Sequence, residues 1–164
     1  MTRHSFSMQE QTMAMAQRTI HPDDLQDSFI KRFSARFAPG AVVVHAARTA
    51  DETPTTVASR LAELGFSTGQ QCALPDVVLY DIEKHWLVLA QIAGSSPPMT
   101  QERVAELREA LAGSDAAFTF VSAFADFDSW GKWVDQIAWQ TEVWLAEAPD
   151  HMIHFNGERL LHAH

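Results

Sequence analysis

The residues with the clearest potential for chemistry are Asp76 and Gln91, which lie near the ends of two adjacent apolar runs. The first run, 77–80, reads VVLY and directly follows Asp76, and the second, 86–90, reads WLVLA and ends just before Gln91. Two such runs, rich in β-branched and aromatic residues and joined by a polar turn, predict a β-hairpin. Because the start of one strand lies beside the end of its antiparallel partner, we expect Asp76 and Gln91 to come close together.

This arrangement suggests the chemistry of a metal-dependent phosphodiesterase, with one difference. Such a site uses two carboxylates on neighbouring strands to hold Mg²⁺, and a lysine two residues after the second carboxylate, on the same face, to position or activate water. Here Asp76 supplies the first carboxylate, but Gln91 stands at the second and Ala93 at the lysine. A glutamine carbonyl can contact a metal but brings no charge, so we predict weak metal binding by Asp76 and Gln91.

Length and composition predict an acidic protein with one folded domain. The chain has 164 residues, a formal net charge of −9 and an estimated pI of about 5.2, so as a whole it should repel a phosphate backbone. Its single cysteine, Cys72, excludes an internal disulfide and favours a reducing cytoplasm. The apolar runs are too short for a membrane span. We therefore expect a cytoplasmic protein without a membrane partner.

The periodicity of apolar residues predicts an α/β fold with a central mixed β-sheet flanked by helices. Residues 1–21 are expected to form an N-terminal arm and 22–164 the folded domain. A helix beginning at Asp23 or Asp24 carries apolar side chains every four residues, and Pro39-Gly40 ends it. The other expected elements are strands at 41–44, 118–124 and 152–155, helices at 57–64, 130–144 and from the N-cap Thr100 to Gly113, and a turn at Asn156-Gly157.

Three stretches of the chain resemble the BsuBI/PstI family of type II restriction endonucleases. They are FSARFAPG at 33–40, PDVVLYDIEKHWLVL at 75–89 and AWQTEVWLAEAPDHMIHFNGERLL at 138–161. The resemblance runs from about Phe29 to Leu161 and implies the PD-(D/E)XK nuclease fold, with DNA as substrate and Mg²⁺ as cofactor. The family's enzymes also have a substantial N-terminal portion, expected to help in DNA recognition, where this chain has a short arm.

The resemblance assigns roles at individual positions. Asp76 matches the family's first metal-binding aspartate, whereas Gln91 stands where the family has glutamate. The family's Trp-Glu-Thr-Glu becomes Trp-Gln-Thr-Glu, which retains Glu142 but not the glutamate at Gln140. The family's Ser-Pro-Lys-Arg is replaced by TQER at 100–103, which puts an acidic residue in place of a basic one.

Two further features have both a functional and a structural interpretation. His151 and His154 are spaced like metal ligands, but the resemblance places them in a stretch where alternation buries one and exposes the other, which favours a structural role. Trp139 could belong to an oligomer interface or stack on a base, although a core position is the more common role of such tryptophans.

Two functions follow from these observations. In the first, the chain is a Mg²⁺-dependent DNA endonuclease whose catalytic residues are Asp76, Gln91 and Glu142 or Asp81. In the second, it is a nuclease-fold protein that has lost catalysis and acts as a binding or regulatory subunit through protein–protein contacts. The losses at Gln91 and Ala93 favour the second. A homodimer is expected for a restriction enzyme, because palindromic DNA sites are commonly bound by two-fold dimers. The inactive protein is expected to associate with itself or with another protein.

Overall fold

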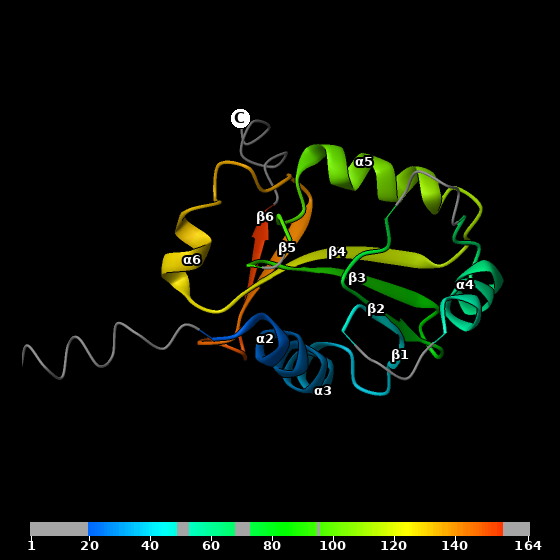
Figure 1. The fold of residues 1–164 in the computed structure, drawn as a ribbon, viewed down its shortest axis with the longest axis horizontal. Coiled ribbons are helices and arrows are strands. Elements are labelled where there is room, and N and C mark those ends of the chain that lie inside the picture. The colour runs from blue at the N-terminus through cyan, green and yellow to red at the C-terminus, as the bar shows by residue number, and fades with distance from the viewer. Residues whose placement is uncertain (1–19, 49–52, 68–72, 95, 156–164) are drawn as a thin grey trace, which may run out of the picture.

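A computed structural model describes residues 20–48, 53–67, 73–94 and 96–155, which form one six-stranded sheet with helices on both faces (Figure 1). The strands lie in the sheet in the order in which they occur along the chain, β1-β2-β3-β4-β5-β6. The elements are α2 (Pro22–Ser28), the π-helical turn η1 (Phe29–Phe33), α3 (Ser34–Phe37), β1 (Val42–Ala46), α4 (Pro54–Glu63), β2 (Val77–Asp81), β3 (Trp86–Ile92), α5 (Gln101–Ala110), β4 (Ala117–Phe124), α6 (Phe127–Gly131), β5 (Thr141–Leu145) and β6 (Met152–Phe155).

The sheet is mixed, which confirms the predicted fold class. Strands β3, β4 and β5 are parallel, and antiparallel pairs flank them on both sides. Parallel neighbours need a crossover connection, which α5 provides between β3 and β4, and α6 with the loop after it between β4 and β5. The predicted hairpin is also present, with Val77 opposite Ala90 and Asp81 opposite Trp86.

Apolar side chains on the two faces of the sheet pack against different helices. On one face, α2 and η1 bury Phe29 and Phe33, and the ring of Phe29 meets Trp144 edge-on at 5.5 Å. On the other face, α4 and α5 bury Leu61 and Leu107 against the strands. Figure 1 shows α2 and α3 on one side of the sheet and α5 on the other. The sheet is therefore covered on both faces, as expected for strands with near-continuous apolar runs.

The helix predicted at 130–144 is wrong. Helix α6 ends at Gly131, turns follow, and Gln140 adopts a positive φ of 60° just before β5 begins. The strand hydrogen-bonds to β4 on one side and β6 on the other, so its conformation is fixed by partners distant in sequence. The apolar pattern of this stretch also predicts that Trp133, Ile137 and Trp144 point inward. Ile137 and Trp144 are buried, which confirms the prediction for these two, whereas Trp133 is only partly buried.

Two boundaries also differ from the prediction. Helix α4 begins at Pro54, where Pro occupies the first turn and the Thr53 side chain accepts a hydrogen bond from the backbone of Thr56. The apolar run 41–44 predicts a short buried strand, but β1 runs from Val42 to Ala46 at the edge of the sheet, with Val42 47% and Val43 39% exposed and Val44 and Ala46 buried. The predicted arm at 1–21 falls almost entirely outside the described residues, as do Cys72 and the turn at 156–157. Within the described part, no helix is long and apolar enough to cross a membrane.

Candidate active site

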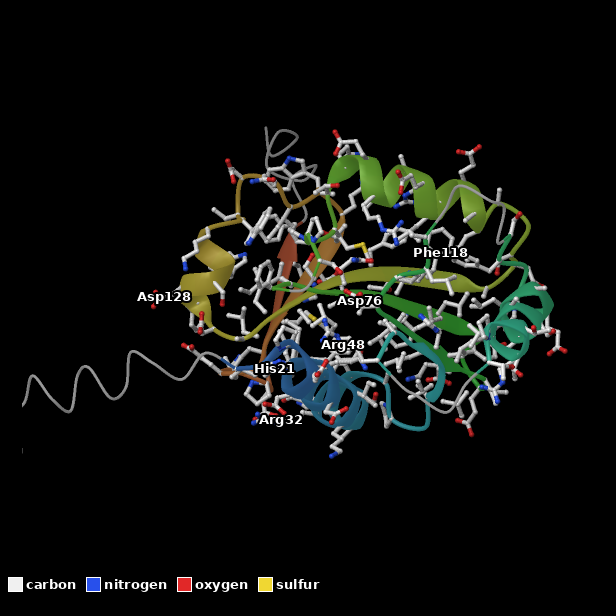
Figure 2. All side chains as sticks on the ribbon, viewed as in Figure 1. His21, Arg32, Arg48, Asp76, Phe118 and Asp128 are labelled. Atoms are coloured by element: carbon white, nitrogen blue, oxygen red, sulfur yellow. The ribbon has the colours of Figure 1, made fainter. Side chains whose placement is uncertain are left out.

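Asp76 lies at the entrance to β2, beside the carboxyl end of β3. Its Oδ2 accepts a hydrogen bond from the Ile92 backbone amide at 2.7 Å, and its Oδ1 accepts one from the Ser96 hydroxyl at 3.1 Å. Figure 2 shows Asp76 near the middle of the molecule in this view, whereas Asp128 of α6 lies at its outer tip. The predicted proximity is confirmed, because the Gln91 amide nitrogen is 3.5 Å from Asp76 Oδ2.

Gln91 is 6% exposed, and its amide is oriented by Arg103 of α5. The Nε and Nη2 atoms of Arg103 both donate to Gln91 Oε1 at 3.4 Å. Because a guanidinium has donors only, the amide oxygen must face Arg103 and the amino group must face Asp76. The carbonyl that was expected to contact a metal therefore points away from the Asp76 carboxylate.

The Arg103 guanidinium has two further hydrogen-bond partners besides Gln91. Its Nη2 donates to the Ala73 carbonyl at 2.7 Å, which ties α5 to the segment leading into Asp76, and its Nη1 donates to Glu106 at 3.1 Å. The sequence signal for this position is the N-cap Thr100, whose hydroxyl accepts from the Arg103 backbone and so places Arg103 in the first turn of α5. In the sequence, Arg103 is the one basic residue of TQER at 100–103, and no local pattern indicates its contact with Gln91.

Ala93 occupies the position expected for lysine, and its surroundings are apolar. It lies on the same face as Gln91, two residues further along, and is 8% exposed. Its cluster contains Phe124, Ile137 and Val143. A lysine here would have to place its ammonium group in or beyond this cluster, so the surroundings of Ala93 suit the residue that is present.

A cavity of about 340 Å³ adjoins Asp76 and opens between the β3–α5 loop and the first turns of α5. Its described lining includes the carboxylates of Asp76, Glu102 and Glu106 and the guanidinium of Arg103. Glu102 stands where the resemblance implies a lysine. The carboxylates thus outnumber the guanidinium in the cavity, which disfavours the approach of a phosphate group.

These residues do not fit Mg²⁺. A magnesium site needs oxygen ligands in octahedral geometry, usually with one or two carboxylates. Asp76 offers one carboxylate whose two oxygens are already hydrogen-bonded, and Gln91 turns its amino group to it. Within the residues that the structure describes, no group of three or more His, Cys, Asp or Glu side chains could hold a metal ion.

The structure does not bring Glu142 to Asp76 and Gln91. In the register of the parallel strands, Gln91 pairs with Ser122 and then Val143, so Glu142 points to the opposite face of the sheet. There its carboxylate contacts the imidazole of His154, the residue directly opposite on β6.

Asp81, the alternative to Glu142, lies at the far end of the hairpin from Asp76. Its Oδ1 accepts a hydrogen bond from the Lys84 backbone at 3.1 Å, and its Oδ2 lies 3.2 Å from the Lys84 ammonium. The backbone hydrogen bond is the main cause that holds the pKa of Asp81 below its ordinary value. The side chain therefore stabilises the turn.

The other sequence candidates lie outside this site. The expectation that alternation buries either His151 or His154 is wrong, because both are exposed. Trp139 is 63% exposed, so it belongs to the surface and not to the core, and its ring lies 5.7 Å from that of Phe155. The backbone of Ala138 donates to the Met99 carbonyl at 2.8 Å, which places Trp139 near the start of α5.

The six-stranded mixed sheet with helices on both faces defines a restriction-endonuclease-like α/β domain. The family model of the BsuBI/PstI restriction endonuclease domain matches residues 7–158, and the chain belongs to this family. The type II restriction enzyme BsuBI of Bacillus subtilis is 36% identical over 138 residues, which cover 84% of this chain and 44% of that enzyme. The type II restriction enzyme AplI of Arthrospira platensis is 33% identical over 87 residues, 53% of this chain and 27% of that enzyme.

A solved structure agrees with the sequence comparisons. The SdaI restriction endonuclease superposes with a TM-score of 0.74 at 33% identity, over 86% of this chain and 44% of that structure. This similarity confirms the restriction-endonuclease-like fold. The chain spans less than half the length of each of these relatives, so it corresponds to a part of each.

Proposed function

We propose that this chain is a restriction-endonuclease-family domain that has lost Mg²⁺-dependent hydrolysis and acts as a binding or regulatory subunit. The observation that carries the proposal is the pair of uncharged side chains, Gln91 and Ala93, at the positions of the second carboxylate and the lysine. Both are more than nine-tenths buried, and neither side chain carries a charge for a metal ion or a phosphate. Single losses of such transition-state contacts typically reduce rates by about 10²–10³.

The electrostatics of the cavity support the same proposal. A scissile phosphate would have to approach three carboxylates, of Asp76, Glu102 and Glu106, with one guanidinium to offset them. In an enzyme, bound Mg²⁺ compensates such negative charge, and its contribution would be polarising the phosphate and activating water. With a metal site that does not fit, the repulsion is left in place.

A protein partner suits this chain better than free DNA. Its net charge of −9 opposes a phosphate backbone, whereas three large apolar side chains from the same part of the chain are exposed: Phe127 by 48%, Val134 by 42% and Trp139 by 63%. Exposed aromatic residues are enriched at protein interfaces. The protein partner we propose includes a second copy of this chain. We propose the reducing cytoplasm as the place where the protein acts.

The second candidate is a Mg²⁺-dependent DNA endonuclease with residual activity. The observation that supports it is Asp76, which lies beside Gln91 and which the resemblance matches to the family's metal-binding aspartate, in a chain whose named relatives are restriction enzymes. Metal binding would then require Gln91 to rotate its amide and release Arg103.

Cleavage of supercoiled and linear DNA with Mg²⁺ or Mn²⁺ distinguishes the two candidates, with Asp76→Ala as the control. The first proposal expects no cutting at protein concentrations above that of the DNA. Cutting by the wild-type chain that disappears in Asp76→Ala would overturn it and establish the second candidate. Cutting that persists in Asp76→Ala would identify a contaminating nuclease.

A further inference from the structure

We infer that Arg103 takes the place of the divalent cation as the positive charge of this site, so that Asp76, Gln91 and Arg103 form a network that excludes metal. The inference deepens the proposed function and rests on it for its biological meaning. It also assigns a reason for the retention of Asp76 in a site without its second carboxylate.

The first step is the order of charges along the network. The Gln91 amide lies between the other two groups, with its oxygen 3.4 Å from two Arg103 nitrogens and its nitrogen 3.5 Å from Asp76 Oδ2. The negative end of the amide dipole thus faces the guanidinium and its positive end faces the carboxylate. Each contact is attractive in this orientation, and rotating the amide would reverse both.

The second step is the position of the guanidinium. The Arg103 side chain is 15% exposed, and it bonds to the Ala73 carbonyl three residues before Asp76. A charge held in this partly buried position is screened less than one at the surface. Its Nη1 pairs with the more exposed Glu106 carboxylate at 3.1 Å, while Nε and Nη2 face Gln91. A divalent cation on the Asp76 carboxylate would therefore meet the guanidinium across the width of one amide group.

The third step is the occupation of Asp76 itself. Its two oxygens accept from the Ile92 amide and the Ser96 hydroxyl, which join the start of β2 to the end of β3 and the loop after it. The carboxylate therefore has a structural role without metal. A cation bound to these two oxygens would compete with their hydrogen bonds to Ile92 and Ser96. Coordination by the Gln91 carbonyl would also break its contacts with Arg103.

Titration of the full chain with Mn²⁺ by calorimetry tests the inference, with each variant repeated in an Asp76→Ala background. Arg103→Leu removes the guanidinium and frees the Gln91 carbonyl, so we expect Asp76-dependent Mn²⁺ binding at least tenfold tighter than in the wild type. Arg103→Lys keeps the charge and should not gain this affinity. Arg108→Leu is the matched control, because Arg108 lies on the same helix over the rings of Phe118 and Phe120.

Two results would overturn the inference. One is Mn²⁺ binding by the wild type that is as tight as in Arg103→Leu and is lost in Asp76→Ala. The other is a folded Arg103→Leu variant that gains no affinity. If this variant does not fold, the wild type alone decides through its Ile92 amide resonance, since this amide bonds to Asp76. Broadening by micromolar Mn²⁺ would contradict the inference, and an unchanged resonance would support it.

The outcomes separate this inference from the proposed function. Mn²⁺ bound at Asp76 without DNA cleavage would overturn the inference and leave the proposed loss of hydrolysis standing. Asp76-dependent cleavage of DNA would overturn the proposed function. The metal titration needs no DNA, so its result does not depend on the identity of any substrate or partner.

Discussion

Replacing Gln91 by glutamate should make the stability of the domain depend on a divalent cation. A carboxylate at residue 91 would face the Arg103 guanidinium at 3.4 Å and the Asp76 carboxylate at 3.5 Å. At an effective dielectric constant of about 20, the attraction and the repulsion are each about 5 kcal/mol, so they nearly cancel. The remaining cost is the desolvation of a charge at a position that is 6% exposed, for which roughly 1–3 kcal/mol is a lower estimate.

Urea unfolding with and without Mn²⁺ measures this effect. We expect Gln91→Glu to lose stability without metal and to regain about 2.7 kcal/mol when free Mn²⁺ is 100-fold above its dissociation constant. Gln101→Glu, the same change at an exposed position of α5, should stay within about 0.5 kcal/mol of the wild type under both conditions. If Gln91→Glu matches the wild type and ignores Mn²⁺, residue 91 does not face Asp76 as described. Adding Ala93→Lys is expected to destabilise the variant further, because Ala93 lies in an apolar cluster.

Three other predictions concern the scaffold of the site. Gly65→Ala should lower the unfolding free energy by about 2–5 kcal/mol, because φ is +77° and an added Cβ would lie 2.6 Å from the backbone that follows α5. Gly40→Ala, at φ +86° with open space around it, should cost only about 1–2 kcal/mol. Equal losses of the two variants in urea unfolding would contradict this prediction. Asp81→Asn should destabilise the domain at neutral pH. The difference in unfolding free energy between this variant and the wild type should shrink as the pH falls from the ordinary pKa of 3.8 through the lowered pKa of the folded state. A difference that stays constant across this pH range would refute the role of the charge. Trp144→Ala should lower the unfolding free energy by about 3–5 kcal/mol because Trp144 is fully buried. Trp139→Ala should lower it by less than about 0.5 kcal/mol because Trp139 is exposed. A larger loss for Trp139→Ala in chemical denaturation would contradict its assignment as a surface residue.

Several features that depend on local sequence were predicted correctly, although the helix that begins at Pro54 was expected to begin at residue 57. The hairpin follows from two apolar runs and a short polar turn, and its register brought Asp76 and Gln91 together as expected. The N-cap Thr100 located the start of α5. These features depend on neighbouring residues, so the pattern of the chain is sufficient to define them.

The parts that depend on distant partners were missed. The tryptophans between 130 and 144 have a spacing compatible with a helix, but strand β5 forms there because β4 and β6 provide hydrogen-bonding partners. Likewise, the contact of Arg103 with Gln91 joins residues separated by an entire loop, and the opposite orientation of Glu142 follows from the register of three strands. No local pattern contains this information.

The central claim is that Asp76, Gln91 and Arg103 form a network that excludes metal. The most direct test is the crystal structure of the protein from crystals grown in the presence of Mn²⁺. Anomalous difference density identifies the manganese positions. We predict no peak within coordinating distance of Asp76, with Arg103 hydrogen-bonded to the Gln91 oxygen. A manganese peak at the Asp76 carboxylate, with the Gln91 oxygen turned toward it, would contradict the account.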